Sequence, residues 1–310
     1  MLMRRCCGAL MRVRALTSKG GCVGLGGGVG VRRAASSLRD IAEAGRYNSV
    51  SIKLPQADWL TAQPNPDFKA DLEQSLVQWQ EQQKTAAWIV VPPSLSWAVY
   101  PATECGFQLH HVRDDHIYLM KWLEADTSCR VPPYATHQVG VAGLVLDKDM
   151  NVLVIKERNA RVSGFKLPGG LSDPGEDIHT TAEREVLEET GVQCKFHSIL
   201  SMRQQHKAAY GVSDLYIVCR CTPVTTDIEA CPTEIAEARW MPIHDYAAQT
   251  TDMNARIARM VAAEAEQQPQ PFHPATTLAC DMTMRTLPSV VHKNRLFDLY
   301  LPAAAAKHEQ

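Results

Sequence analysis

The stretch Gly170-Leu-Ser-Asp-Pro-Gly-Glu176, followed after seven residues by Arg184-Glu-Val-Leu-Glu-Glu-Thr-Gly-Val192, is the most informative part of this sequence. Its first half predicts a loop, because glycine permits sharp turns and Pro174-Gly175 is a typical turn dipeptide. Its second half predicts a helix near Ile178 to Thr190. Gly191 is suited to end that helix, because glycine readily adopts the left-handed conformation found just after a helix.

Three glutamates of this predicted helix share one face. Glu185, Glu188 and Glu189 stand at positions i, i+3 and i+4, so their carboxylates project on the same side. Like charges placed this way repel by roughly a few tenths of a kcal/mol per pair, which is tolerable when a cation is bound. Hard oxygen ligands favour Mg²⁺ or Mn²⁺. A glutamate-rich helix face that is merely solvated is the alternative interpretation.

The spacing of the whole stretch is similar to the Nudix box, G-x5-E-x7-R-E-U-x-E-E-x-G-U, in which U is a bulky aliphatic residue. No defined position departs from it. Further segments resemble one Nudix subfamily, namely His137 to Gly143, Phe165 to Gly170, Arg203 to His206 and Ser213 to Cys219. That subfamily contains a vertebrate protein encoded antisense to basic fibroblast growth factor, and plant hydrolases of ADP-ribose and NADH.

The resemblance and the apolar patterns together predict an α+β protein. We expect a Nudix α/β/α sandwich with a mixed sheet over residues 135–267, and a C-terminal extension of weak periodicity over 268–310. Residues 47–130 resemble the small acetyltransferase-like domain that precedes the Nudix domain in this subfamily. Between residues 41 and 136 the sequence contains two glycines, Gly45 and Gly106. Two are too few for a glycine-bearing loop that would hold coenzyme A. We therefore expect this domain to serve homodimerisation or regulation.

The resemblance also implies a metal site. The expected oxygen donors are the Gly169 carbonyl and the carboxylates of Glu185, Glu188 and Glu189. Glu176 and Arg184 would support these ligands, since arginine can hold a carboxylate in a charge-assisted pair. The Mg²⁺ or Mn²⁺ ions would neutralise the diphosphate of the substrate and lower the pKa of the water that attacks phosphorus.

Two roles in the expected reaction stay open at the level of the sequence. Our preferred hypothesis is that Glu185 is the base that accepts the proton of the water. The alternative is that this base is Glu229 or Glu234, on a later loop. Substrate contacts are expected from three residues that follow a strand, namely Arg203, Gln204 and His206. Ordinary polarity at the end of a strand is the alternative explanation for these three.

The expected function is that of a metal-dependent diphosphatase, an enzyme acting on a small nucleotide-derived molecule, ADP-ribose or NADH. A Nudix enzyme for oxidised nucleotides or coenzyme A is one alternative, and a regulatory or binding protein of the same fold is another. The complete carboxylate set argues against the latter. The proline that often marks ADP-ribose enzymes is missing from Gln205 to Ala209, and the signatures of NADH and coenzyme A enzymes are missing too. Substrate identity therefore rests on the subfamily resemblance.

The N-terminus has the composition of a mitochondrial transit peptide. Up to residue 39 it holds eight Lys and Arg residues, several Ser and Thr residues and no Asp or Glu. We therefore expect residues 1–40 to direct the protein to mitochondria, with the cytoplasm or nucleus as the alternative if they are only a disordered basic tail. Cleavage after Arg33 would remove seven of 32 basic residues and leave 25 against 34 acidic ones, a net charge of −9.

The remaining composition excludes several protein classes. A body as acidic as this is poorly suited to binding nucleic acid. No run of residues reaches the roughly 18–20 apolar residues that a membrane helix needs. The ten cysteines include no Cys-x-x-Cys pair, which favours free thiols in a reducing compartment over a disulfide or zinc framework.

Overall fold

The computed structural model describes residues 37–55, 65–159, 164–250, 252–288 and 296–303. These residues form two compact units, which divide between Tyr134 and Ala135. The expected transit peptide lies outside the described residues apart from 37–40. Within the described part of the chain, no helix is long and apolar enough to span a membrane.

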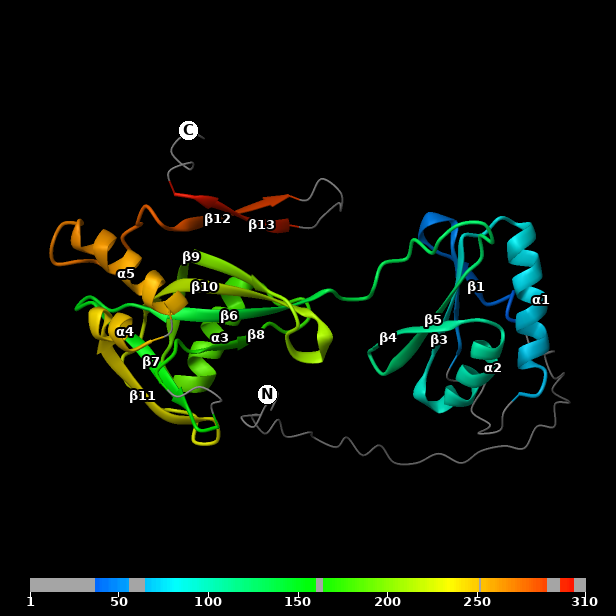
Figure 1. Cartoon of the computed structure of the whole chain (residues 1–310), viewed down its shortest axis with the longest axis horizontal. Coiled ribbons are helices and arrows are strands. Elements are labelled where there is room, and N and C mark those ends of the chain that lie inside the picture. Colours follow the sequence, from blue (N-terminus) through cyan, green and yellow to red (C-terminus); the bar gives the residue numbers. More distant parts are fainter. Residues whose placement is uncertain (1–36, 56–64, 160–163, 251, 289–295, 304–310) are drawn as a thin grey trace, which may run out of the picture. The chain divides into compact units, whose positions relative to one another are not determined.

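The first unit is built on a five-stranded sheet in the order β1-β2-β3-β5-β4 (Figure 1). Its strands are β1 (Ala42–Ala44), β2 (Val50–Lys53), β3 (Ala86–Val91), β4 (Gln108–Arg113) and β5 (His116–Trp122). Strands β2 and β3 run parallel, and the other neighbouring pairs are antiparallel. Short 3-10 turns, η1 (Arg46–Asn48) and η2 (Pro93–Ala98), connect some of these elements.

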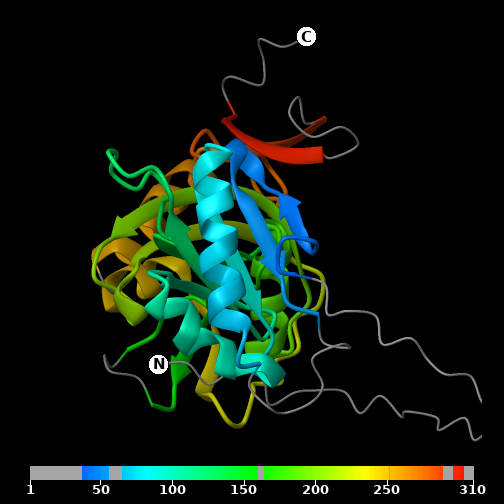
Figure 2. The ribbon, with the colours of Figure 1, turned by 90° about the vertical axis from the view of Figure 1, so that its right-hand side faces the viewer.

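Helices α1 (Phe68–Glu81) and α2 (Val99–Glu104) cover one face of this sheet, and Figure 2 shows α1 lying across the strands. Leu72 and Trp79, at helical spacing, share a buried core with Ile89 of β3. Because side chains alternate along a strand, Trp88 points to the opposite face of the sheet, where it is half-buried.

The second unit contains a mixed six-stranded sheet, in the order β13-β12-β9-β10-β6-β8, and a two-stranded sheet, β11-β7. The strands are β6 (His137–Val145), β7 (Asn151–Glu157), β8 (Gly169–Leu171), β9 (Cys194–Gln205), β10 (Ser213–Pro223), β11 (Ile235–Pro242), β12 (Met282–Pro288) and β13 (Leu296–Pro302). Strands β6 and β10 run parallel, whereas β9 is antiparallel to β10. A further 3-10 turn, η3 (Ala209–Gly211), precedes β10.

Helices cover both faces of this sheet (Figure 1). Val141 and Val145 of β6 share a core with α3 (Ile178–Thr190), while the alternate residues Ala142 and Leu144 share a core with α4 (Ile243–Gln249) and α5 (Asp252–Glu266). The predicted α+β class and the mixed sheet between helices are confirmed, as is a smaller α+β unit that precedes them.

Close packing of α3 on β6 fixes the position of the glutamate-bearing helix. A Cβ atom on Gly143 would lie 2.6 Å from Cγ2 of Val186, so a larger residue there would push the helix away from the sheet. At the other end, Gly191 ends α3 with a φ of +72°, the left-handed conformation that the sequence predicted. The predicted helix bounds, Ile178 to Thr190, are those of α3.

The tail after Gln267, in which the sequence shows only weak periodicity, contains β12 and β13. These strands pair with each other, and Met282 of β12 pairs with Ile199 of β9. Arg220 of β10 anchors the segment before them, because its guanidinium binds Asp281 at 2.5 Å. The hairpin escaped detection because its position depends on partners far away in the sequence rather than on local periodicity.

Candidate functional site

Arg184 gathers three carboxylates around one guanidinium. Its Nε and Nη2 donate to Glu176 at 2.7 and 2.8 Å. Its Nη1 donates to Glu185 at 2.8 Å and to Glu188 at 3.1 Å. These contacts, those with Glu176 first, raise the pKa of Arg184, which stays charged. Three anions around one cation leave an excess of negative charge at this point of the helix.

Glu176 fastens the glycine loop to α3. Its Oε2 also accepts hydrogen bonds from the Asp173 N–H, at 3.0 Å, and from the Thr181 hydroxyl, at 2.9 Å. The hydrogen bonds from Arg184 lower the pKa of Glu176 from 4.5 to about 2. Glu176 is therefore ionised at neutral pH and acts as a fixed support of the loop, in keeping with the role that the resemblance implied.

Glu189 is the most buried of the three helix glutamates, at 7% exposure. Its Oε2 accepts a hydrogen bond of 2.7 Å from the Gly169 N–H, which brings the backbone of β8 against the carboxylate. Burial raises the pKa of Glu189 to about 8, although Lys166 opposes this shift. Lys166 itself contacts Glu157. A buried carboxylate is costly unless a cation balances it, so Glu189 favours a bound positive ion.

Glu185 lies against the bare backbone of Gly170. A Cβ atom on Gly170 would come within 2.6 Å of Oε1 of Glu185, so any larger residue would displace the carboxylate. Burial raises the pKa of Glu185, whose side chain is 14% exposed. The glycine loop of the sequence motif thus serves close approach as well as turning.

The donor set fits a hard divalent cation. Glu188 is 53% exposed, whereas Glu185 and Glu189 are largely buried, so the carboxylate face of α3 runs from the interior to the surface. Excess negative charge, oxygen donors and partial access are what Mg²⁺ or Mn²⁺ requires. Among the described residues, the carboxylates of Glu185, Glu188 and Glu189 do not form a group whose ligand atoms all lie within 4.8 Å of one another.

A second polar group, formed by Arg203, Asp214 and Tyr216, is separated from these carboxylates by two glycines. Arg203 of β9 donates to Asp214 of β10 at 2.6 Å, and its guanidinium lies 5.0 Å from the ring centre of Tyr216. A Cβ atom on Gly140 would lie 3.2 Å from the Tyr216 ring and 3.8 Å from the Gly170 carbonyl oxygen. Gly140 and Gly170, here called the glycine strip, therefore separate the Arg203–Asp214–Tyr216 group from the carboxylate of Glu185.

Sequence reasoning did not single out Asp214 and Tyr216 as site residues. They lie two apart on β10, so both face the same side of the sheet as their β9 neighbours Gln205 and Arg203. Their segment belongs to the quoted subfamily resemblance. The alternation of side chains along β10 could have pointed to Asp214 and Tyr216. That alternation could be used only once β9 was known to be the neighbouring strand.

The structure does not bring the three expected substrate contacts together. Gln204 lies next to Arg203 on β9 and therefore faces the opposite side of the sheet, where its Nε2 lies 2.7 Å from Nε2 of His137. His206 follows the end of β9 and is exposed, with its Nδ1 at 2.9 Å from the Ser213 hydroxyl. Arg203 is the member that contacts Tyr216, whose ring lies against Gly140.

The two loop acids considered as alternative bases are both exposed. The backbone N–H of Glu229 donates to the Thr190 carbonyl at 2.8 Å, beyond the end of the carboxylate face. The carbonyl of Glu234 accepts a hydrogen bond of 2.9 Å from Arg158. Among the residues that the structure describes, neither carboxylate has a hydrogen bond or ion pair with Arg184 or the helix glutamates.

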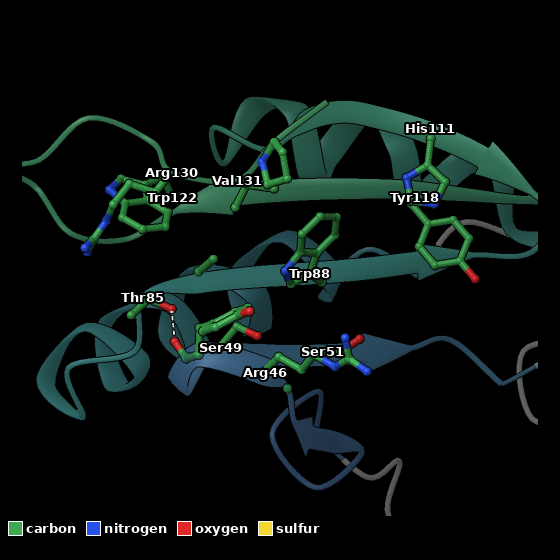
Figure 3. Close-up of a pocket in the computed structure, with 14 residues that line it drawn as sticks. Arg46, Ser49, Ser51, Thr85, Trp88, His111, Tyr118, Trp122, Arg130 and Val131 are labelled. Carbon is green, nitrogen blue, oxygen red and sulfur yellow. Dashed lines mark hydrogen bonds between the residues drawn. The ribbon is translucent and has the colours of Figure 1, made fainter. Parts of the chain in front are cut away.

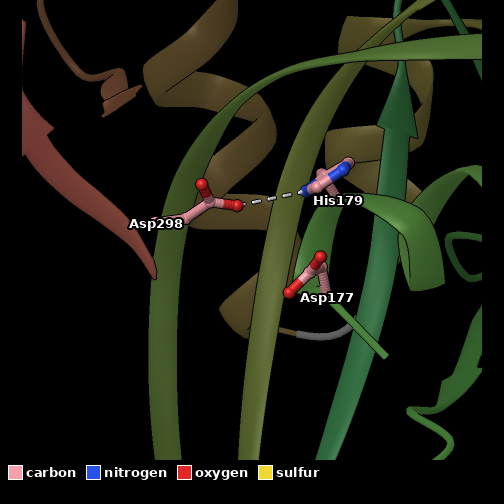
Figure 4. Close-up of side chains that lie close together, drawn as sticks. All are labelled: Asp177, His179 and Asp298. Carbon is pink, nitrogen blue, oxygen red and sulfur yellow. Dashed lines mark ion pairs between the residues drawn. The ribbon is translucent and has the colours of Figure 1, made fainter. Parts of the chain in front are cut away.

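Another charged cluster lies at the start of α3 (Figure 4). The ligand atoms of Asp177, His179 and Asp298 lie within 4.8 Å of one another, and Nδ1 of His179 is 3.7 Å from Oδ2 of Asp298. Asp298 also accepts a hydrogen bond of 2.7 Å from Thr286 across the β12–β13 hairpin. The cluster ties this hairpin to the helix start and stands apart from the carboxylates near the helix end.

Comparisons with known proteins match both units. A family model described as NUDIX domain matches residues 136–263, and one described as Nudix hydrolase domain matches residues 42–123. The human protein named Nucleoside diphosphate-linked moiety X motif 6 is 41% identical over 224 residues, 71% of each chain. The Xenopus laevis protein of that name is 44% identical over 200 residues, 63% of this chain and 88% of the relative. Nudix hydrolase 2 of Arabidopsis thaliana is 39% identical over 197 residues, 62% of this chain and 70% of the relative.

Proposed function

Because the chain belongs to the Nudix hydrolase family, and is thus an enzyme for nucleoside diphosphates linked to another moiety, we propose that it hydrolyses ADP-ribose or NADH. One observation carries this proposal. The Arg203–Asp214–Tyr216 group lies on the sheet face that α4 and α5 cover, and Glu185 lies on the α3 face, with the backbone of the glycine strip at the β6–β8 edge between them. A substrate that spans this edge would meet both sets of contacts.

We propose Mg²⁺ or Mn²⁺ as the divalent ion on which this family generally depends. Its donors would be the Gly169 carbonyl and the carboxylates of Glu185, Glu188 and Glu189. When bound, such an ion neutralises the diphosphate charge and makes an attacking water more acidic. The charge excess around Arg184 and the burial of Glu189 support this assignment.

The side chains of the protein divide the remaining tasks. Arg184 and Glu176 hold the glycine loop and α3 in one geometry, so the helix glutamates need not reorganise during the reaction. Glu185 is the base that we favour for the proton of the attacking water, because its carboxylate lies against Gly170 at the edge of the glycine strip. Glu229 and Glu234 are less suited to this role, since both are exposed and, among the described residues, neither carboxylate has a hydrogen bond or ion pair with Arg184 or the helix glutamates.

The Arg203–Asp214–Tyr216 group would bind the half of the substrate that lies beyond the diphosphate. Tyr216 offers a ring for stacking, and Arg203, held by Asp214, offers a fixed guanidinium. Binding energy from this remote half can align the attacked phosphorus. His206 is a further candidate contact at the end of β9, and His206→Ala should lower kcat/KM for the dinucleotide while metal affinity is unchanged.

A competition among substrates tests the proposal. Under one metal condition, kcat/KM would be measured for ADP-ribose, NADH, coenzyme A, dGTP and 8-oxo-dGTP, with Glu188→Gln protein as the background. ADP-ribose or NADH should lead, with AMP as one product. A triphosphate that is preferred tenfold or more, which corresponds to ~1.4 kcal/mol, would contradict the substrate proposal and leave the family assignment intact.

Residues 1–40 supply a proposal about location. The arginine-bearing composition of this segment, which has no Asp or Glu up to residue 39, supports import into mitochondria. Residues 1–45 fused to a fluorescent reporter should direct it to mitochondria in cells, and a diffuse signal would contradict the idea. We likewise retain the division into 47–130, 135–267 and 268–310, with a dimerising or regulatory role for the first part, as a proposal.

A further inference from the structure

The first unit contains a pocket of about 770 Å³ on the sheet face opposite to α1 and α2 (Figure 3). Its floor is formed by Trp88 of β3 and by Tyr118 and Trp122 of β5. The turn around Arg46 borders it on one side, and the segment 130–132 borders it on the other. All lining residues belong to the first unit, so this pocket is distinct from the site on α3.

Aromatic rings give the pocket rigid walls. Figure 3 shows Trp88 in the middle, with Trp122 at one end and Tyr118 at the other. His111 stacks on Tyr118 and on Tyr134, with ring centroids 4.2 Å and 4.0 Å apart, so the three rings form a continuous stack. Rings held in this way lose little conformational entropy when a ligand binds, and their faces suit a flat aromatic partner.

Two arginines place positive charge at the border of this aromatic floor. Arg130 is already used in part, because it donates to Glu124 at 2.7 Å and lies over the Trp122 ring. Arg46 has no ion pair or hydrogen bond from its side chain to any described residue, and Figure 3 shows it extending beside Ser51. Burial lowers the pKa of His111, which therefore adds no charge at neutral pH. Arg46 is thus the available cation of the pocket.

We propose that this pocket binds a purine mononucleotide, whose base stacks on Trp88 and Trp122 and whose phosphate meets Arg46. A nucleobase has the flat face that the indoles accommodate, and a phosphate forms charge-assisted hydrogen bonds with a guanidinium. The volume lies within the range of sites for small molecules, roughly 300–1,000 Å³. A purely apolar occupant would leave Arg46 without a partner. The site is independent of the proposed substrate, because it shares no residue with the glycine strip.

Isothermal titration calorimetry on the full chain tests this inference. The protein would carry Glu188→Gln, and the buffer would contain EDTA, so that neither turnover nor metal-dependent binding contributes. Three probes separate the parts of the ligand, namely AMP, adenosine and inorganic phosphate. We expect AMP to bind at least tenfold more tightly than adenosine or phosphate alone. AMP that binds no more tightly than adenosine, or not at all, would overturn the proposal.

Substitutions then locate the binding. Arg46→Ala should reduce the affinity for AMP to that for adenosine and leave adenosine unchanged, whereas Trp88→Leu should weaken both. Arg113→Ala, an exposed arginine of β4 outside the pocket, is the matched control and should change nothing. Arg46 is a surface residue, so its variant should keep the melting temperature of the parent. If AMP affinity survives both Arg46→Ala and Trp88→Leu but falls with Tyr216→Ala, the nucleotide binds in the second unit and the inference is wrong.

Discussion

Arg220 and Arg184 both bind carboxylates in the second unit, but they differ in burial and in the balance of charge around them. Arg220 and Asp281 have no exposed side-chain surface, and the single carboxylate of this cluster faces Arg220, with Nε2 of His197 3.5 Å from it. The remaining donors of Arg220 reach the carbonyls of Pro274, at 2.6 Å, and Thr276, at 2.7 Å. Arg184 is one quarter exposed and faces several acids. The first cluster is closed to further ligands, whereas the second is open.

This difference separates a structural cluster from a functional one. Where every donor and every charge has a partner, a further ligand gains nothing, and loss of one partner leaves a costly buried charge. Where acids outnumber the cation and one of them reaches solvent, the cluster still attracts a positive ion. The two arginines are thus distinguished by the number of their charged partners and by the access of solvent to the cluster, and not by residue type. The following predictions test that distinction.

The largest effect is expected from Asp281→Asn, which leaves the buried Arg220 without a counter-charge. Loss of one partner from such a pair costs about 3–5 kcal/mol of the free energy of unfolding. Urea unfolding would measure it, with Glu237→Gln in an exposed pair as the control, expected to change stability by less than ~0.5 kcal/mol. Replacing both partners by apolar residues, Arg220→Met with Asp281→Leu, should recover part of the loss. A change below ~1 kcal/mol in Asp281→Asn would show that the pair is not structural.

The open cluster should respond in activity instead of stability. Glu188→Gln or Glu189→Gln should lower kcat at least about hundredfold, which corresponds to ~2.7 kcal/mol of transition-state stabilisation. The melting temperature should stay close to that of the parent, because removal of one of several crowded charges relieves repulsion. Steady-state kinetics and thermal unfolding of the same samples give both readings. Full turnover of the unaltered enzyme in EDTA would refute the metal site itself.

Acid should weaken the support of the open cluster in a defined range. The hydrogen bonds from Arg184 hold the pKa of Glu176 at about 2, below its usual 4.5. A depressed pKa contributes stability that is fully present above pH 4.5 and lost as the pH falls toward 2, on the order of 2 kcal/mol for this well-covered group. Glu176→Gln should therefore lower stability at pH 7 and flatten its decline between pH 4.5 and 2. Parallel pH profiles for variant and parent would contradict this.

The smallest effect is expected at Arg203, which has a single acidic partner and is exposed. Arg203→Ala should lower kcat/KM for ADP-ribose about tenfold, or ~1.4 kcal/mol. Gln204→Ala is the matched control, because this neighbour faces the other side of the sheet, and it should change kcat/KM less than about twofold. Equal losses in the two variants would place the substrate elsewhere.

Much of the second unit could be predicted from the sequence because its signals are local. The helix from Ile178 to Thr190, its end at Gly191 and the common face of its glutamates follow from spacings within one or two turns. The Nudix family and the class of enzyme follow from the same segment, since a carboxylate face with a fixed loop in front of it is one continuous stretch of chain.

What only the tertiary structure decided depends on residues that are distant in the sequence. Burial of Glu189 requires β8, contact of Glu185 with Gly170 requires the loop to fold back on α3, and the Arg220–Asp281 pair joins positions 61 residues apart. Periodicity indicates on which side of a helix or strand a residue lies, but not which other element packs against that side. The sequence therefore determined which acids share a helix face, and the packing of β6, β8 and the C-terminal hairpin determined which of them are buried, paired or open to a cation.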